Sequence, residues 1–329
     1  MPGDKNIGFG LLVGLLLLIA ALFKFSPVCA ETEVEKRIGV LLFGEEQRYL
    51  AQEKGAVEKL AEEGFSEPNV HFFMENAEGS KAKAAELAQR FAALKLDLIF
   101  VFGTSAALAV ANEIKDVPLV CGAYDPVASG LTLEWKSSGN NTTGVSPKIP
   151  LAELVRKLQE LVAVKKIGVL YTPHEKNSEA VLIELVGLQD DLRIRIIPVP
   201  LTREGEITEL LPEVLRVTDA IYLTGSSIVG KNRGLIVDAA TKARVVTITH
   251  LDDLAEEGVL LSMVVNQYRM GRLAGEKGAK ILRGTKPSAI PYETLPLEQL
   301  ELILNMKTAK AGGFHIPPSL MKQVTKIIE

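Results

Sequence analysis

The chain has 329 residues, of which 47% are hydrophobic and 24% charged, and its formal net charge is -4 at pH 7. A chain of this length can bury a large hydrophobic core, and it predicts two domains rather than one. The mild negative charge and the few aromatic residues argue against a nucleic-acid partner, because the sequence has no basic stripe to neutralise phosphates.

The first element is an apolar run over residues 7–23, preceded by Lys5 and followed by the small-residue sequence VCA at 28–30. This order is typical of a secretory signal peptide over residues 1–30, cleaved after Ala30. We therefore expect the body of the protein in the periplasm or at the extracellular face of the cytoplasmic membrane.

Two residues in this region keep other interpretations open. Lys24 follows the apolar run directly, so the segment is also compatible with an uncleaved N-terminal anchor. Cys29 invites lipidation, but the residues before it lack the usual pattern of a lipidation box. After cleavage only Cys121 remains, which excludes an internal disulfide and predicts a buried thiol.

The body repeats itself. RIGVLLFG at 37–44 recurs as KIGVLYTP at 166–173, and short apolar runs alternate with segments of helical period after each copy. The runs begin near residues 38, 69, 98 and 117 in the first half and near 167, 193, 219 and 244 in the second. Alternating strands and helices predict parallel sheets, and the repeat predicts two of them in tandem. The expected fold is thus α/β, with two doubly wound, Rossmann-like lobes.

The turns that follow the predicted strands are the candidate binding residues. Ligands of doubly wound sheets bind at the carboxyl ends of the strands, and two facing lobes can share one cleft. The polar or small residues in these turns are Gly44, Glu45, Thr104, Ser105, Tyr124, Asp125, Asn177, Ser226, Ser227 and His250.

The sequence FVFGTSAALAVAN at 100–112 has three possible interpretations. Thr104 or Ser105 could simply cap the following helix. The same turn could hold an anionic group on the free amides of the helix N-terminus. It also nearly matches the G-x-S-x-G elbow of serine hydrolases, with Ala107 in place of the second glycine.

Two catalytic interpretations have weaker support. GSSIVGKN at 225–232 resembles a phosphate-binding loop, but Asn232 stands where Ser or Thr should hold magnesium. A hydrolase would need Ser105 beside His250, which fall in different predicted lobes, and no glycine-rich oxyanion loop precedes the elbow. The histidines show no metal-ligand spacing, so neither a metal nor a cofactor is expected.

Several longer segments resemble the ABC transporter substrate-binding proteins of the tryptophan/tyrosine-binding type. They are YDPVASGL at 124–131, NNTTGV at 140–145, KKIGVLYTPHEKNS at 165–178, QYRMGRLAGEKGAKILRGTKPSAIP at 267–291 and LILNMKTAKAGGFHIPPSL at 302–320. Their order and spacing together make the resemblance specific.

The resemblance implies the type I periplasmic-binding-protein fold and a receptor that hands a small solute to a membrane permease. It implies that Thr104, Ser105, Tyr124, Asp125 and Asn177 face the ligand. Since the sequence after residue 30 has no further long apolar run, we also expect a soluble monomer, and we expect no cofactor. The sequence departs from the family at Ser226 and Ser227, where relatives carry an acidic and then a polar residue. Two kinds of ligand are therefore left open: an amino acid, aromatic ones included, and another small polar or anionic solute.

A two-lobed chain of this kind needs three crossings between lobes. We expect a first lobe of residues 31–143 plus 266–292 and a second of residues 144–265 plus 293–329. Asn266 is expected at the cleft floor, where it would touch the ligand, or else to satisfy local backbone as a strand-end residue. Gly144 is expected to be a hinge residue whose replacement by alanine changes affinity but leaves the ligand-free stability within about 1 kcal/mol.

Overall fold

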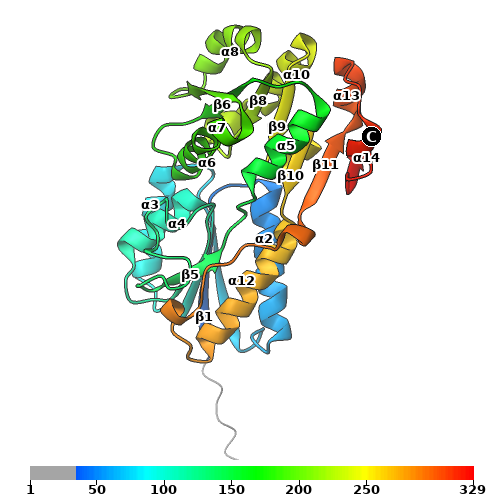
Figure 1. The fold of residues 1–329 in the computed structure, drawn as a ribbon. Coiled ribbons are helices and arrows are strands. Elements are labelled where there is room, and N and C mark those ends of the chain that lie inside the picture. Colours follow the sequence, from blue (N-terminus) through cyan, green and yellow to red (C-terminus); the bar gives the residue numbers. More distant parts are fainter. Residues whose placement is uncertain (1–34) are drawn as a thin grey trace, which may run out of the picture. The chain divides into compact units, whose positions relative to one another are not determined.

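The computed structural model describes residues 35–329, whose strands form two sheets covered by helices on both faces (Figure 1). The predicted signal peptide, Ala30 and Cys29 lie outside the described residues. Within residues 35–329, no helix is both long and apolar enough to cross a membrane.

The first sheet has five parallel strands in the order β2-β1-β3-β4-β5. Helices α2 and α12 cover one face, and α3 and α4 cover the other (Figure 1). All five residues of β3, LIFVF, are buried, as expected for a strand of a parallel sheet that is covered on both faces. The elements are β1 (Lys36–Leu42), β2 (Val70–Asn76), β3 (Leu98–Phe102), β4 (Leu119–Gly122), β5 (Thr142–Val145), α2 (Gln47–Glu62), α3 (Lys81–Ala92), α4 (Thr104–Glu113) and α12 (Gln267–Leu282).

The second sheet has seven strands in the order β12-β11-β10-β9-β8-β6-β7, and only the β10–β11 pair is antiparallel. Helices α5 and α6 pack on one face, and α8 and α10 on the other. The elements are β6 (Lys166–Tyr171), β7 (Arg195–Pro200), β8 (Ala220–Leu223), β9 (Val246–Thr249), β10 (Leu261–Val264), β11 (Glu301–Asn305), β12 (Lys326–Ile328), α5 (Leu151–Leu161), α6 (Lys176–Gly187), α7 (Gln189–Leu192), α8 (Glu206–Val217), α9 (Ser227–Lys231), α10 (Arg233–Ala243), α11 (Asp252–Glu256), α13 (Met306–Gly312) and α14 (Pro318–Met321), with single 3-10 turns at Pro287–Ala289 and Leu297–Gln299.

The predicted α/β fold with two doubly wound lobes is confirmed. Each of the eight predicted strand starts lies within two residues of the observed one. The chain crosses between the lobes three times, after β5, before α12 and before β11. Strand β5 belongs to the first sheet through Val145, two residues beyond the boundary expected at residue 143.

Two of the crossing segments lie side by side. Val145 and Glu293 form a parallel bridge, and the Ser146 amide donates to the Glu293 carbonyl at 2.8 Å. Lys148, just after the first crossing, donates to Asp125 of the first lobe at 2.7 Å and pairs with Glu184 of the second at 2.9 Å. The two crossing segments are thus joined by backbone hydrogen bonds, and the ion pairs of Lys148 lie close to them in the sequence.

Helices α2 and α12 touch backbone to backbone because glycines stand at their crossing. A Cβ on Gly271 would lie 2.1 Å from the Gln52 carbonyl oxygen, and one on Gly55 would lie 2.2 Å from the Tyr268 carbonyl oxygen. Only glycine permits this approach, since real Cβ atoms do not come so close to other atoms. The close crossing brings the side chain of Gln52 against that of Gln267.

The expectation for Gly144 is wrong. Its φ is not positive, and a Cβ there would lie 1.9 Å from the Cys121 carbonyl oxygen on the neighbouring strand. The glycine therefore permits close packing of β5 against β4 and is not there for conformational freedom.

We now expect Gly144→Ala to destabilise the ligand-free protein by about 1–3 kcal/mol, because backbone atoms must move to admit the methyl group. Urea unfolding of the ligand-free protein measures this. Gly168→Ala on β6 is the matched control, because its methyl would meet only the side chains of Val214 and Thr218, at 3.1 and 3.2 Å. Equal midpoints for Gly144→Ala and the unsubstituted protein would contradict the prediction.

Candidate functional site

The turns after the strands of the two sheets line three neighbouring cavities. An inner cavity of about 40 Å³ and an outer cavity of about 630 Å³ each share lining residues with a neck of about 10 Å³. The inner cavity is lined by Arg48, Tyr49, Gln52, Gly103, Thr104, Gly122, Tyr124, Pro147, Asn177, Gly225, His250, Leu251 and Gln267. The neck is lined by Phe43, Glu46, Arg48, Tyr49, Thr104, Ser105, Glu175, Asn177, Gly225 and Ser227.

The N-terminus of α4 supplies the first lobe's part of the neck. The helix is preceded by Gly103 with φ 114°, and no side chain caps it. The simple capping role considered for Thr104 and Ser105 is therefore wrong, and the Thr104 hydroxyl instead accepts from the Tyr124 amide at 3.1 Å. Because the first amides of a helix have no partner within the helix, this terminus is suited to an anionic group.

Glu175 is a buried carboxylate of the second lobe, 5% exposed, in the turn between β6 and α6. It accepts a hydrogen bond from the Ser227 amide at 2.9 Å and another from the Ser227 hydroxyl. Ser227, a predicted ligand contact, thus also holds this carboxylate at the neck. Glu175 was not among the predicted site residues.

Asn177 follows Glu175 by two residues and has a fixed amide orientation. Its Nδ2 donates to the Gly225 carbonyl at 2.7 Å, and a carbonyl can only accept, so Oδ1 faces the other way. This Oδ1 is buried and has no hydrogen-bond partner among residues 35–329. The neck is therefore lined by a residue with an unpaired acceptor, Asn177, and by a residue with a carboxylate, Glu175.

His250 is enclosed by aromatic residues and is neutral. Its Nδ1 lies 2.8 Å from the Tyr222 hydroxyl, and its ring centroid lies 4.8 Å from that of Tyr124. Burial, with a smaller effect of the Arg48 charge, lowers its pKa to about 3. The Ser105–His250 hydrogen bond that a hydrolase needs does not occur in the described part of the chain.

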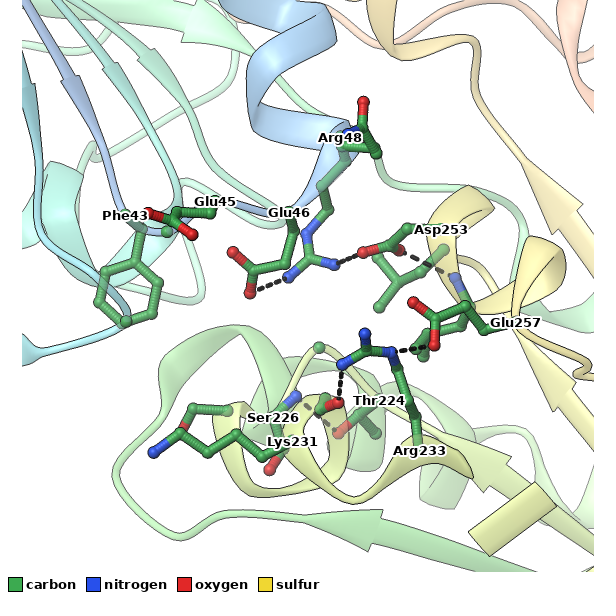
Figure 2. A pocket seen from close by; sticks show the side chains of 18 of the residues that line it. Phe43, Glu45, Glu46, Arg48, Thr224, Ser226, Lys231, Arg233, Asp253 and Glu257 are labelled. Atoms are coloured by element: carbon green, nitrogen blue, oxygen red, sulfur yellow. Dashed lines mark hydrogen bonds and ion pairs between the residues drawn. The ribbon is translucent and has the colours of Figure 1, made fainter. Parts of the chain in front are cut away.

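Arg48 closes the neck on its outer side. Its guanidinium reaches from α2 of the first lobe to Asp253 on α11 of the second, and it also bonds Glu46 at 3.1 Å (Figure 2). Gly44, Glu45 and Ser226 line the outer cavity beyond it. The charged side chains of the outer cavity are largely paired, since Arg48 bonds Glu46 and Asp253 and Arg233 bonds Glu257.

Two predicted site residues lie away from these cavities. Asp125 is occupied by structural bonds, since Oδ1 accepts from the amides of Val127 and Ala128 and Oδ2 from Lys148. Asn266 is not at the cleft floor. Its side chain caps α12 by accepting from the Arg269 amide at 3.0 Å, and it lines another pocket, near Glu301, which shares Gln267 with the inner cavity and Asp253 with the outer one. The local backbone role that the sequence also allowed is the observed one.

Four residues that line the inner cavity or the neck were not predicted from the sequence: Arg48, Gln52, Glu175 and Gln267. Glu175 lies in the same turn as Asn177, which was predicted, and Gln267 is adjacent to Asn266. Arg48 and Gln52 lie one turn apart on the first helix after β1, at its N-terminal end. That position at the carboxyl edge of the sheet was the available signal.

The family follows from a comparison with known proteins. The model of the family described as ABC transporter substrate binding protein matches residues 37–328. The chain belongs to this family. It is thus a substrate-binding protein of an ABC transporter, and the fold and function implied by the resemblance are confirmed.

Individual relatives agree with the family. The binding protein is similar to the tyrosine-binding protein of Clostridioides difficile, with 24% identity over 85% of this chain and 82% of the relative. It is also similar to a Streptococcus pneumonia ABC domain in complex with L-Trp, at 27% identity and a TM-score of 0.84 over 89% of this chain and all of that one. A ligand-free, open substrate-binding protein from Clostridium difficile, at 26% identity over 89% and 99% of the two chains, gives a TM-score of 0.70. The binding protein thus superposes better on the ligand-bound relative than on the open one.

Replacing Arg48 with methionine is expected to shift the ligand-free binding protein toward an open form by about 10- to 100-fold, because a hydrogen bond to a charged group contributes about 1.5–3 kcal/mol. Small-angle scattering should show a larger radius of gyration. Arg233→Met is the control, since Arg233 pairs with Glu257 of its own lobe. The prediction fails if the two variants give the same radius.

Proposed function

We propose that this binding protein captures a free amino acid as a zwitterion in the neck and inner cavity. A single observation carries the proposal: the neck is lined both by the N-terminus of α4 from the first lobe and by Glu175 and Asn177 from the second. One lobe thus offers amides to an anion, and the other offers acceptors to a cation.

The carboxylate end of the ligand is assigned to the first lobe. The amides of Ser105 and Ala106 belong to the unpaired first turn of α4, and the Ser105 side chain lines the neck. Amides and a hydroxyl at a positive helix end stabilise a carboxylate through charge-assisted hydrogen bonds.

The ammonium end is assigned to the second lobe. The free Oδ1 of Asn177 is an acceptor that a donor must satisfy, since leaving a buried acceptor unpaired costs about 1–3 kcal/mol. Glu175 supplies the negative charge. An acid therefore lies beside the ammonium site, although the sequence lacks one at Ser226 and Ser227.

This arrangement explains why binding would close the lobes. A zwitterion reaches both halves of the neck only when they face each other closely, so it favours the closed form by its differential affinity. The named ligands of two relatives, tyrosine and L-Trp, are also amino acids.

The rest of the transport cycle follows from the family. Substrate-binding proteins of ABC transporters act outside the cytoplasm. We propose that residues 1–30 direct export, that the mature protein is a monomer and that it delivers its ligand to an ABC permease in the membrane.

Thermal unfolding of the purified protein against amino acids, organic acids, sugars and purines tests the proposal, since a ligand at about 100 times its Kd adds about 2.7 kcal/mol of stability. Amino acids should raise the Tm, and the other classes should not. Ser105→Ala should weaken amino-acid binding by about 2- to 12-fold. We expect no ester hydrolysis that depends on Ser105. A sugar or purine as the sole stabilising compound would contradict the proposed ligand class.

A further inference from the structure

The residues around the inner cavity include an unusual set of unpaired polar groups. Three of the residues that line it, in addition to Asn177, each carry a buried side-chain atom with no partner among residues 35–329: Gln52 Oε1, Gln267 Nε2 and the Tyr124 hydroxyl. Gln52, Tyr124 and Gln267 are each at most 3% exposed. Buried polar atoms are almost always satisfied, so three together around one cavity point to a polar ligand group.

Gln52 and Gln267, which both line the cavity, leave one donor and one acceptor unpaired whichever way their amides are oriented. The Nε2 of Gln52 donates to the Oε1 of Gln267, which leaves the Gln52 oxygen and the Gln267 nitrogen free. If both amides were flipped, the pair would instead leave a free nitrogen on Gln52 and a free oxygen on Gln267. A ligand group that both donates and accepts fits either arrangement.

The cavity is also electrically neutral at its inner end. Among the described residues that line it, only Arg48 carries a charge, and Asp253 and Glu46 pair with it. Tyr124 stays a neutral phenol, since burial raises its pKa well above the usual range, and His250 is neutral too. A full charge on the ligand would have no counter-charge there.

We infer that the inner cavity is the side-chain subsite, and that it selects amino acids whose side chain ends in an uncharged group able to donate and accept hydrogen bonds. Carboxamide, hydroxyl and phenol ends belong to this class, and hydrocarbon ends do not. This inference rests on the proposed amino-acid function and adds which amino acids are taken.

The selection has a physical basis in the unpaired atoms. A hydrocarbon end would exclude water from Gln52, Gln267 and Tyr124 without giving them partners. Sites built to hydrogen-bond a ligand group reject analogues that lack it by up to about 10⁴–10⁵, whereas a missing methylene changes binding far less.

The test compares ligands of similar shape that differ in the polar end: tyrosine with phenylalanine, glutamine with methionine, and threonine with valine. Calorimetry on the full mature protein gives a Kd for each. In every pair that binds, we expect the polar member to bind at least about tenfold more tightly. In the double variant Gln52→Met/Gln267→Met the preference should fall severalfold or reverse.

The double variant is chosen because it can keep the fold. Replacing both partners of a buried hydrogen bond by apolar groups of similar shape can be nearly neutral, whereas a single replacement would strand the other amide. Gln89→Met, at an exposed position of α3, is the control and should leave the preference unchanged. Its unfolding midpoint and that of the double variant report whether each protein is folded.

The outcomes separate the inference from the proposed function. Binding of none of the six amino acids would overturn both. Equal binding of both members of a pair, or an unchanged preference in the folded double variant, would overturn the inference alone. A preference for the polar member that is lost in the double variant and kept in Gln89→Met supports the subsite.

Discussion

Gly271→Ala is expected to destabilise the ligand-free protein by about 3 kcal/mol or more, because the new methyl group would overlap the backbone of α2. Its Cβ would lie 2.1 Å from the carbonyl oxygen and 2.7 Å from the carbonyl carbon of Gln52. Neither atom can move without moving the helix. Urea denaturation followed by circular dichroism measures the change.

A helix glycine with open space is the control for this substitution. Gly234 lies in α10, its φ is not positive, and beyond its own stretch of helix no described atom lies within 4 Å of where a methyl group would sit. Gly234→Ala should therefore stabilise the protein by about 0.5–1 kcal/mol. We therefore expect Gly271→Ala to lower the free energy of unfolding and Gly234→Ala to raise it. A stability of Gly271→Ala within error of the unsubstituted protein would show that the α2–α12 crossing is not as close as described.

Glu175→Gln is expected to weaken amino-acid binding by about 10- to 100-fold, because it removes the negative charge proposed to face the ammonium group. The glutamine oxygen can still accept from the Ser227 amide, so the turn should keep its shape. Calorimetric titration of the best amino-acid ligand measures the loss. Glu86→Gln on α3, an exposed position, should have no effect.

A deaminated analogue of the same ligand distinguishes a charge effect from a change in the shape of the site. It has no ammonium group, so its affinity should be nearly the same for Glu175→Gln and the unsubstituted protein. If the variant weakened the analogue and the amino acid equally, Glu175 would serve the structure of the turn and not the ammonium group.

The alternation of apolar runs and helical segments predicted the fold well. Each strand of a doubly wound lobe is a short buried run, so its start can be located from composition alone, and the eight predicted starts lie within two residues of the observed ones. Gly144 shows the limit of this reasoning. A sequence does not reveal whether a strand glycine serves a bend or the close approach of a neighbouring backbone.

The site was only partly predictable for a related reason. Thr104, Ser105, Tyr124, Asn177 and His250 line the inner cavity or the neck, as their places after strands indicated. Which of two adjacent residues enters the cavity depends on where a helix begins, and the N-cap at Asn266 turns Gln267 inward instead. The pairing of Gln52 with Gln267, 215 residues apart, has no local signature.

That same sequence separation governs the order in which the chain can fold during synthesis. Helix α2 is made early, but the helix that packs on it, α12, follows after the entire second lobe up to β10. At about 5–20 residues per second, the 215 residues between Gln52 and Gln267 take about 10–40 s to synthesise. Throughout that interval, the face of the first sheet that α2 covers lacks α12, the other helix that packs on it. The nascent first lobe is therefore expected to stay incompletely folded until α12, which ends at Leu282, has been made.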